Sequence, residues 1–282
     1  MRVIAEFTMR SRGHALGVAL AGTLLPLMQW VSCGAIGVVT LRHGMREGAF
    51  VLIVVLAPQL LVFAASASPN LLAILVPLQT AVLAGVLHQS RSWELTVCCA
   101  PVLGIAMILL TQLIAAPAIE KPLEVAAALA QQDLDVNPAA YSMILALMTF
   151  FMTLTATAFV CLGRWWQSVL FNPGGFATEF RGLRLSPAIM AGTVLIALVG
   201  VGIGGVFTWW FLPLIVPMVF ASAGLLHFIV DQRGLNSGPL VAYYVTLALG
   251  LVTILPLPFL LLPAVLDSIF DLRGRLTKPN ND

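Results

Sequence analysis

GRWWQSVLFNPGGFATEFRGLRLS, residues Gly163 to Ser186, is a polar stretch that lies between two strongly apolar runs. It begins with one cation and two amphipathic rings, Arg164, Trp165 and Trp166. These residue types end an apolar segment at a membrane–water boundary, because they keep one end of the side chain in water. The stretch is therefore predicted to lie at a membrane surface.

A turn and a short helix are predicted within this stretch. Proline presets φ and glycine accepts positive φ, and the turn residues are Asn172, Pro173, Gly174 and Gly175. After the turn, Phe176, Phe180 and Leu183 recur at helical spacing. The charged residues that fall elsewhere around this helix are Glu179, Arg181 and Arg184. The pattern predicts an amphipathic helix that lies flat on the membrane or folds back against the rest of the protein.

The composition predicts a membrane protein. Of the 282 residues, 60% are hydrophobic and 9% are charged, whereas a soluble globular domain carries about 25% charged residues. Apolar runs of about 20 residues, the length that a transmembrane helix needs, recur along the whole chain. We therefore expect an all-α, polytopic transmembrane helical bundle that forms one integral membrane domain over residues 1–282.

Six apolar runs are predicted to cross the membrane once each. They are residues 49–65, 71–87, 95–116, 141–162, 188–207 and 210–230. Two other stretches, 14–41 and 239–270, are long for one helix and short for two. Each is predicted to form a broken helix or a hairpin, and prolines interrupt the second one.

The distribution of Lys and Arg predicts the orientation, because cytoplasmic loops carry an excess of both. The basic segments are the leader before residue 13, the cluster at 42–46, the stretch 163–186 and the tail after residue 271. All of them fall on one side if both end segments go out and return. We therefore expect both termini in the cytoplasm, and the chain in a bacterial cytoplasmic (inner) membrane.

The predicted spans lack Asp, Glu, Lys and Arg near their midplanes. Intramembrane ionisable groups mark proton relays and ion paths, so their absence argues against a pump or a proton-coupled transporter. The sequence has no HExxH, GxSxG or Walker A motif, and its cysteines have no metal-ligand spacing with a histidine. We therefore expect no enzyme activity, no catalytic residue, no metal, no cofactor and no nucleic-acid partner.

Polar side chains within the spans are the candidate ligand-binding residues. In lipid, Gln59, Gln79 and Gln112 must find partners, either on neighbouring helices or around a ligand cavity. Tyr243 and Tyr244 either face such a cavity or belong to the aromatic belt of the membrane interface.

Two regions are candidates for partner binding. Ala15 and Ala19 repeat at four residues, which lets helices approach closely, either within the chain or in docking to another membrane subunit. The stretch Gly163–Ser186 is either a surface anchor or a coupling element that contacts a partner. Its candidate contact residues are Arg164, Trp165, Trp166, Asn172, Pro173, Gly174, Gly175, Glu179, Arg181 and Arg184.

Two motifs carry a resemblance to a known family. RWWQ at 164–167 is followed by NPGGFxxEFxxLRL at 172–185, and the last apolar run ends in DSIFDLR at 267–273. Together they resemble the YybS-like family of uncharacterised bacterial membrane proteins. That family is distantly similar to the S components of energy-coupling-factor vitamin transporters, which capture a vitamin and dock through an AxxxA pattern on their first helix. Ala15 and Ala19 match this pattern, although the apolar stretches at both ends exceed the six spans of an S component.

The resemblance implies a small-molecule carrier or carrier subunit that draws its energy from a partner ATPase complex. The alternative is a non-catalytic accessory or scaffold subunit of a membrane protein complex, with Gly163–Ser186 as its cytoplasmic contact. Both interpretations place the chain in the lipid bilayer beside other membrane protein subunits. Only the first adds a small-molecule ligand.

Overall fold

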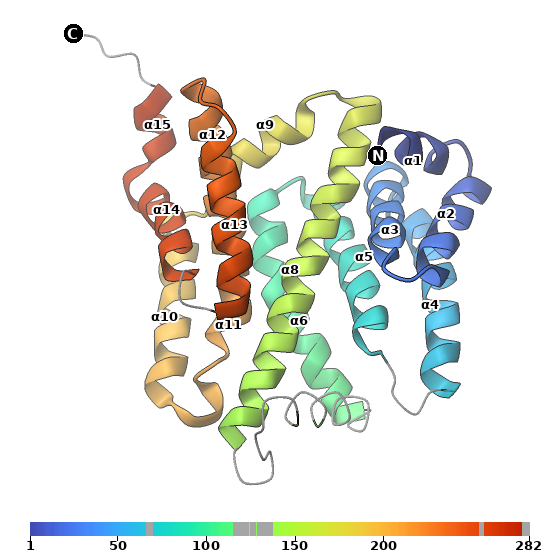
Figure 1. Cartoon of the computed structure of the whole chain (residues 1–282), viewed down its shortest axis with the longest axis horizontal. Coiled ribbons are helices and arrows are strands. Elements are labelled where there is room, and N and C mark those ends of the chain that lie inside the picture. The colour runs from blue at the N-terminus through green and yellow to red at the C-terminus, as the bar shows by residue number, and fades with distance from the viewer. Residues whose placement is uncertain (66–69, 115–123, 125–127, 129–137, 254–256, 278–282) are drawn as a thin grey trace.

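The structure is a computed structural model that describes residues 1–65, 70–114, 124, 128, 138–253 and 257–277. Within these residues every regular element is a helix (Figure 1), which confirms the predicted all-α class. The elements are α1 (Arg2–Thr8), α2 (Arg12–Leu24), α3 (Gln29–His43), α4 (Met45–Ala65), α5 (Leu72–Ser90), α6 (Trp93–Ile114), α8 (Pro138–Phe171), α9 (Gly175–Gly182), α10 (Pro187–Ile203), the 3-10 helix η1 (Gly205–Phe207), α11 (Phe211–Leu214), α12 (Val216–Gln232), α13 (Gly238–Thr253), α14 (Leu257–Phe270) and α15 (Leu272–Thr277).

Several helices are long and apolar enough to cross a membrane, as expected of a polytopic membrane protein. Among the described residues there are 5 such segments, or 6 if α9 and α10, which meet at 63°, form one bent span. The 5 segments are Met45–Ala65, Leu72–Ser90, Trp93–Ile114, Ala140–Phe171 and Gly205–Gln232.

Helix ends differ from the predicted span ends where local chemistry overrides hydropathy. The fourth span is predicted to end at residue 162, but α8 continues to Phe171 because no proline occurs between residue 162 and the Asn172–Gly175 turn. Helix α10 ends before residue 207 because Gly204, with φ of 75°, turns the chain out of the helix. Residues 115–116 of the third expected span lie outside the described residues.

Each of the two long end stretches contains two helices. Residues 14–41 hold most of α2 and α3, which pack together and are joined by the Ser32 hydroxyl donating to the Ala19 carbonyl at 2.7 Å. Residues 239–270 hold most of α13 and α14, and the residues between these helices lie outside the described ones. With 13 and 15 residues, α2 and α3 are about 20 Å long. Neither crosses the roughly 30 Å of a hydrocarbon core alone.

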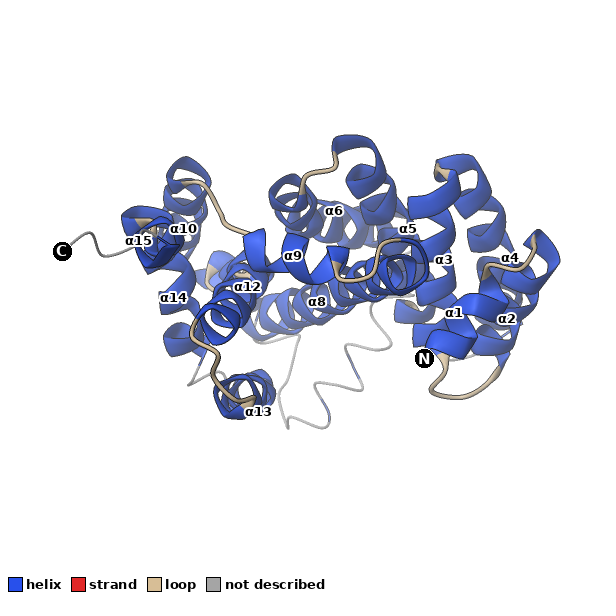
Figure 2. Cartoon of the chain, turned by 90° about the horizontal axis from the view of Figure 1, so that it is seen from above, coloured by secondary structure: helices blue, strands red, loops and turns tan. Residues whose placement is uncertain are grey.

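Helix α9 lies across one end of the bundle. Figure 2 shows it between an N-terminal group, α1–α4, and a C-terminal group that contains α10 and α12–α15, with α6 and α8 beside it. Helices α1 and α15 lie at this same end (Figure 1). We call it the α9 end.

Helix α3 is enclosed by α2, α4, α5 and α8. Every residue from Val31 to Leu41 is buried. Its backbone approaches α8 so closely that a Cβ added to Gly163 would lie 2.7 Å from the Cα of Gly37. Because both positions are glycine, α8 is fixed against α3 just below the point where the polar residues of the α9 end begin.

Candidate functional site at the α9 end

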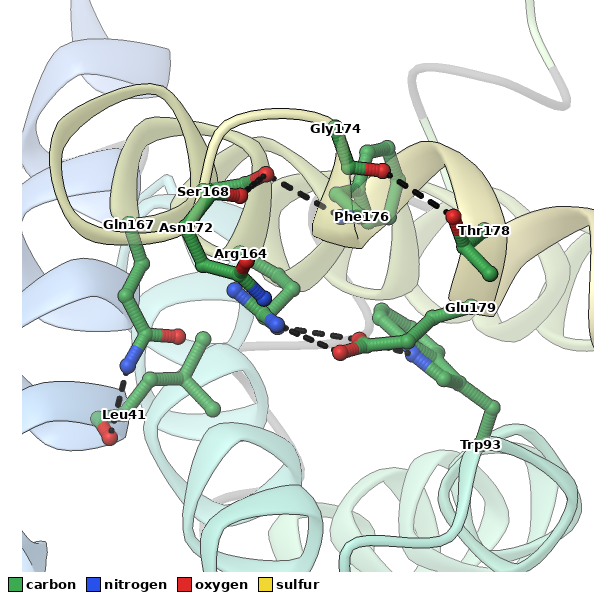
Figure 3. A network of polar contacts seen from close by, with 10 residues as sticks. All are labelled: Leu41, Trp93, Arg164, Gln167, Ser168, Asn172, Gly174, Phe176, Thr178 and Glu179. Atoms are coloured by element: carbon green, nitrogen blue, oxygen red, sulfur yellow. Dashed lines mark hydrogen bonds and ion pairs between the residues drawn. The ribbon is translucent and has the colours of Figure 1, made fainter.

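The turn between α8 and α9 is held by side chains of its own. The amide of Gly175 donates to the Asn172 carbonyl at 2.9 Å, and Gly174 has φ of 84°. The Ser168 hydroxyl donates to the Asn172 carbonyl at 2.7 Å and accepts from the amide of Phe176 at 3.0 Å (Figure 3). These bonds fix the direction in which α9 leaves α8.

Glu179 of α9 accepts hydrogen bonds from two other helices. Nε of Arg164, on α8, donates to Oε2 of Glu179 at 2.9 Å, while its Nη2 donates to Oε1. Nε1 of Trp93, on α6, donates to the same Oε2 at 3.1 Å. Figure 3 shows the three side chains pointing toward one another. The pair is a bidentate, charge-assisted contact, so Glu179 joins α6, α8 and α9.

Two arginines extend this connection to the C-terminal group. Nη1 of Arg181 lies 2.5 Å from Oδ2 of Asp231, just before the end of α12. Nη1 of Arg184 lies 2.7 Å from Oδ1 of Asp271, between α14 and α15. A further contact at this end is the hydrogen bond from the amide of Ser186 to the Glu94 carboxylate. We call the whole cluster the α9 clasp. Its members are Trp93, Glu94, Arg164, Glu179, Arg181, Arg184, Ser186, Asp231 and Asp271.

The clasp brings together the two motifs that carry the YybS-like resemblance. Arg184, from the first motif, pairs with Asp271 of the second and donates through Nη2 to the carbonyl of Ser268 at 3.1 Å. Within the second motif, the buried Asp267 lies 3.4 Å from Nε of Arg273. Both motifs therefore belong to one polar cluster that closes the α9 end.

A polar pocket of about 370 Å³ opens beside the clasp. It lies between α3, α5, α8 and α9, and we call it the basic pocket; its lining residues are Leu41, Arg42, Leu87, His88, Arg91, Arg164, Gln167 and Glu179. Arg42 and Arg91 are exposed, and neither forms an ion pair with another described residue. The guanidinium of Arg42 lies 4.4 Å from the ring centroid of Phe171. Arginine outnumbers carboxylate in this lining, so the pocket attracts anions.

The wall of the basic pocket is held in place at the end of α3. Nδ1 of His88, on α5, lies 3.1 Å from the carbonyl oxygen of Leu41. Nε2 of Gln167, on α8, donates to the same oxygen at 3.2 Å (Figure 3). These contacts position the adjacent Arg42 at the mouth of the pocket.

The predicted ligand-binding residues lie in separate parts of the bundle and do not line the basic pocket. Gln79 is fully buried between α5, α6 and α8, where it donates to the Ala100 carbonyl at 2.8 Å. The other four also have local partners: Gln59 donates to the Thr23 carbonyl, Gln112 to the Tyr141 hydroxyl, Tyr243 to the Val219 carbonyl, and Tyr244 shares a hydrogen bond with His227. The five side chains therefore form hydrogen bonds between neighbouring helices and do not converge on one ligand cavity.

The predicted docking residues Ala15 and Ala19 face the interior. They are 5% and 0% exposed, in the cluster that packs α2 against α3 and α4. Docking a partner through them would require α2 to leave α3. The small residues on the outward face of α2 are Gly13, Gly17 and Ala21.

The two tryptophans predicted for a membrane boundary have different environments. Trp165 is 37% exposed, whereas Trp166 is 1% exposed and packs against Gly34 of α3. Pro173, in the turn, is exposed. Only Trp165 therefore presents its ring to the surroundings.

The sequence did not reveal that Trp93, Glu94, Asp231 and Asp271 are contacts of the clasp, or that Arg42 and Arg91 line a pocket. The sequence feature that could have indicated these residues is their shared position at the ends of apolar runs, next to the basic loops. Among the described residues, no three His, Cys, Asp or Glu side chains are placed to hold a metal ion together.

The described residues form helices, several of them long and apolar enough to cross a membrane, with a polar cluster at one end. Comparison of the chain with known protein families, curated proteins and solved structures gives no match. The YybS-like resemblance therefore rests on its two motifs.

Proposed function

We propose that the chain is a membrane-embedded carrier, or carrier subunit, for a small anionic molecule that binds in the basic pocket. The observation that carries this proposal is the placement of Arg42 and Arg91, without carboxylate partners among the described residues, beside Arg164. The volume of about 370 Å³ falls within the roughly 300–1,000 Å³ of small-molecule sites.

The expected ligand carries a carboxylate or a phosphate. A guanidinium presents its donors as a planar fork that matches either group. Among the described lining residues the only carboxylate is Glu179, which is already paired with Arg164. A bound anion would therefore interact with Arg42 and Arg91 and compete with Glu179 for Arg164. Ligand occupancy would thus act on the clasp and on the position of α9.

The proposed topology has six crossings, by α4, α5, α6, α8, α10 and α12, with α9 as an amphipathic helix at the interface. Phe176 and Phe180 pack against the core, while Glu179 and Arg181 form the polar contacts of α9. The pairs α2–α3 and α13–α14 enter from the α9 end and return to it. Because Lys and Arg concentrate at this end, it is assigned to the cytoplasm of a bacterial inner membrane, with both termini inside.

Stabilisation by anions tests the pocket. We expect some members of a panel of small carboxylates and phosphate esters to raise the Tm of the detergent-purified protein, because a ligand at 100 times its Kd stabilises the folded state by about 2.7 kcal/mol. The double variant Arg42→Gln/Arg91→Gln should lose this shift. Arg233→Gln is the matched control, since Arg233 is an exposed arginine outside the pocket. Equal shifts in the double variant and the wild type would contradict the proposal.

The second candidate is a non-catalytic accessory or scaffold subunit of a membrane complex. The observation that favours it is the pairing of the predicted intramembrane ligand residues, such as Gln79 and Tyr243, with neighbouring helices. In this case exposed arginines of the α9 end, such as Arg46 and Arg275, would contact the partner. Charge reversal at these two positions would then abolish capture of that partner, while small anions would leave the Tm unchanged.

A further inference from the structure

A second hollow, of about 620 Å³, lies among α1, α2, α3 and α4 and shares no lining residue with the basic pocket. We call it the N-terminal hollow. The lining residues that determine its chemistry include Arg10, Arg12, Leu16, His43, Glu47 and Val51.

The lining changes from polar to apolar with distance from the α9 end. On α2, Arg12 precedes Leu16 by about one turn; on α3, His43 follows Val39 by the same interval. On α4, Glu47 precedes Val51 in the same way. Since α2 and α4 begin, and α3 ends, at the α9 end, all three helices present polar residues there and apolar residues deeper. This order matches the change from head groups to acyl chains in a bilayer leaflet.

The polar rim carries an excess of positive charge. Nη2 of Arg12 lies 2.5 Å from Oε1 of Glu47, which neutralises that carboxylate. Arg10 has no ion pair among the described residues; its guanidinium lies 5.8 Å from the ring centroid of Phe7. His43 adds ring nitrogens to the same rim. Arg10 is therefore the cation available to a negatively charged ligand.

Helix α1, which borders the hollow, presents apolar side chains to the outside. Val3 is 75% exposed and Phe7 is 44% exposed, while Ala5 and Thr8 face the interior. A short helix with exposed apolar side chains, followed directly by a basic residue such as Arg10, is typical of a segment at the membrane interface. In the proposed topology, the hollow therefore lies where lipid molecules can reach it from the bilayer.

We propose that the N-terminal hollow holds one anionic glycerophospholipid taken from the surrounding membrane. Its phosphate would lie against Arg10 and Arg12, and one acyl chain would pass over Leu16, Phe50 and Val51. The net positive rim favours an anionic head group over a zwitterionic one, because a choline ammonium would add a second positive charge beside Arg10. The site is independent of the basic pocket.

Lipid retention measured by native mass spectrometry tests this site. The full-length protein in detergent is titrated with phosphatidylglycerol, with phosphatidylcholine of the same acyl chains, and with inorganic phosphate. We expect one phosphatidylglycerol molecule to be retained with about tenfold preference over phosphatidylcholine. This is the gain in affinity that one additional charge-assisted hydrogen bond gives. Equal retention of both lipids, or equal competition by inorganic phosphate alone, would overturn the proposal.

Variants locate the lipid within the molecule. Arg10→Gln should lower phosphatidylglycerol retention about tenfold through loss of its charge-assisted bond, and Leu16→Trp should block the hollow. The matched controls are Arg46→Gln, an exposed arginine outside the lining, and Leu20→Trp, one turn further along α2. Both controls should retain the lipid. Wild-type retention by folded Leu16→Trp, or an equal loss in Arg46→Gln, would overturn the assignment.

Discussion

Glu179 joins three helices at the α9 end. Its carboxylate accepts from Arg164 and Trp93, which are 15 and 86 positions away in sequence. Glu179 and Arg164 are recognisable as candidates in the sequence because they lie in a polar stretch with a defined turn. Trp93 is not recognisable in this way, since a tryptophan at the start of an apolar run is explained equally well by the membrane interface. Partners so distant in sequence become visible only when the helices are packed.

The substitution Glu179→Gln should destabilise the protein. It leaves the guanidinium of the largely buried Arg164 without its counter-ion, and the expected loss of stability is about 1 kcal/mol because Glu179 is itself partly exposed to solvent. Thermal unfolding in detergent measures the change. The control is Glu6→Gln, which breaks the exposed Arg2–Glu6 pair on α1 and should shift the Tm little. A Tm as high for Glu179→Gln as for the control would show that the clasp does not stabilise the fold.

At the scale of elements, hydropathy predicted which runs are helical, and turn chemistry determined where they end. Helix α8 passes the apolar boundary at residue 162 and ends only at the Asn172–Gly175 turn. The length of stretch 14–41 predicts a broken helix or a hairpin. In the structure its two helices pack together, and hydrogen bonds of Ser32 with Thr23 and with the Ala19 carbonyl join them. Periodicity could not show which face of α2 turns inward, because small residues occur on both faces.

The lengths of α2 and α3 predict that both ends of this helix pair lie on one side of the membrane. Single cysteines at Ser11, before α2, and at Arg46, after α3, should be labelled from the cytoplasm, as should a cysteine at Ser237. A cysteine at Val206, in η1, should be labelled from outside. The measurement is labelling with a membrane-impermeant maleimide, in a background without the native cysteines. Labelling of Ser11 and Arg46 positions from opposite sides would show that the stretch crosses the membrane once.

At the scale of the whole molecule, the class of fold was predictable and the arrangement was not. Low charge and repeated apolar runs are sufficient to predict an all-helical membrane protein. The convergence of Arg184 with Asp271, or of Arg42 with Arg91, depends on which helices are neighbours. A uniformly apolar helix surface carries little information about its neighbours, since lipid and protein are both apolar partners.

The binding of a small anion in the basic pocket is best tested by mass spectrometry of the material that co-purifies with the tagged protein from its native membrane. We expect one stoichiometric anionic small molecule with the wild type and with Arg233→Gln, and its loss from Arg42→Gln/Arg91→Gln. A partner ATPase in the same sample would extend the claim to a carrier subunit. Recovery of an unrelated membrane complex with no small molecule would contradict the carrier and establish the scaffold.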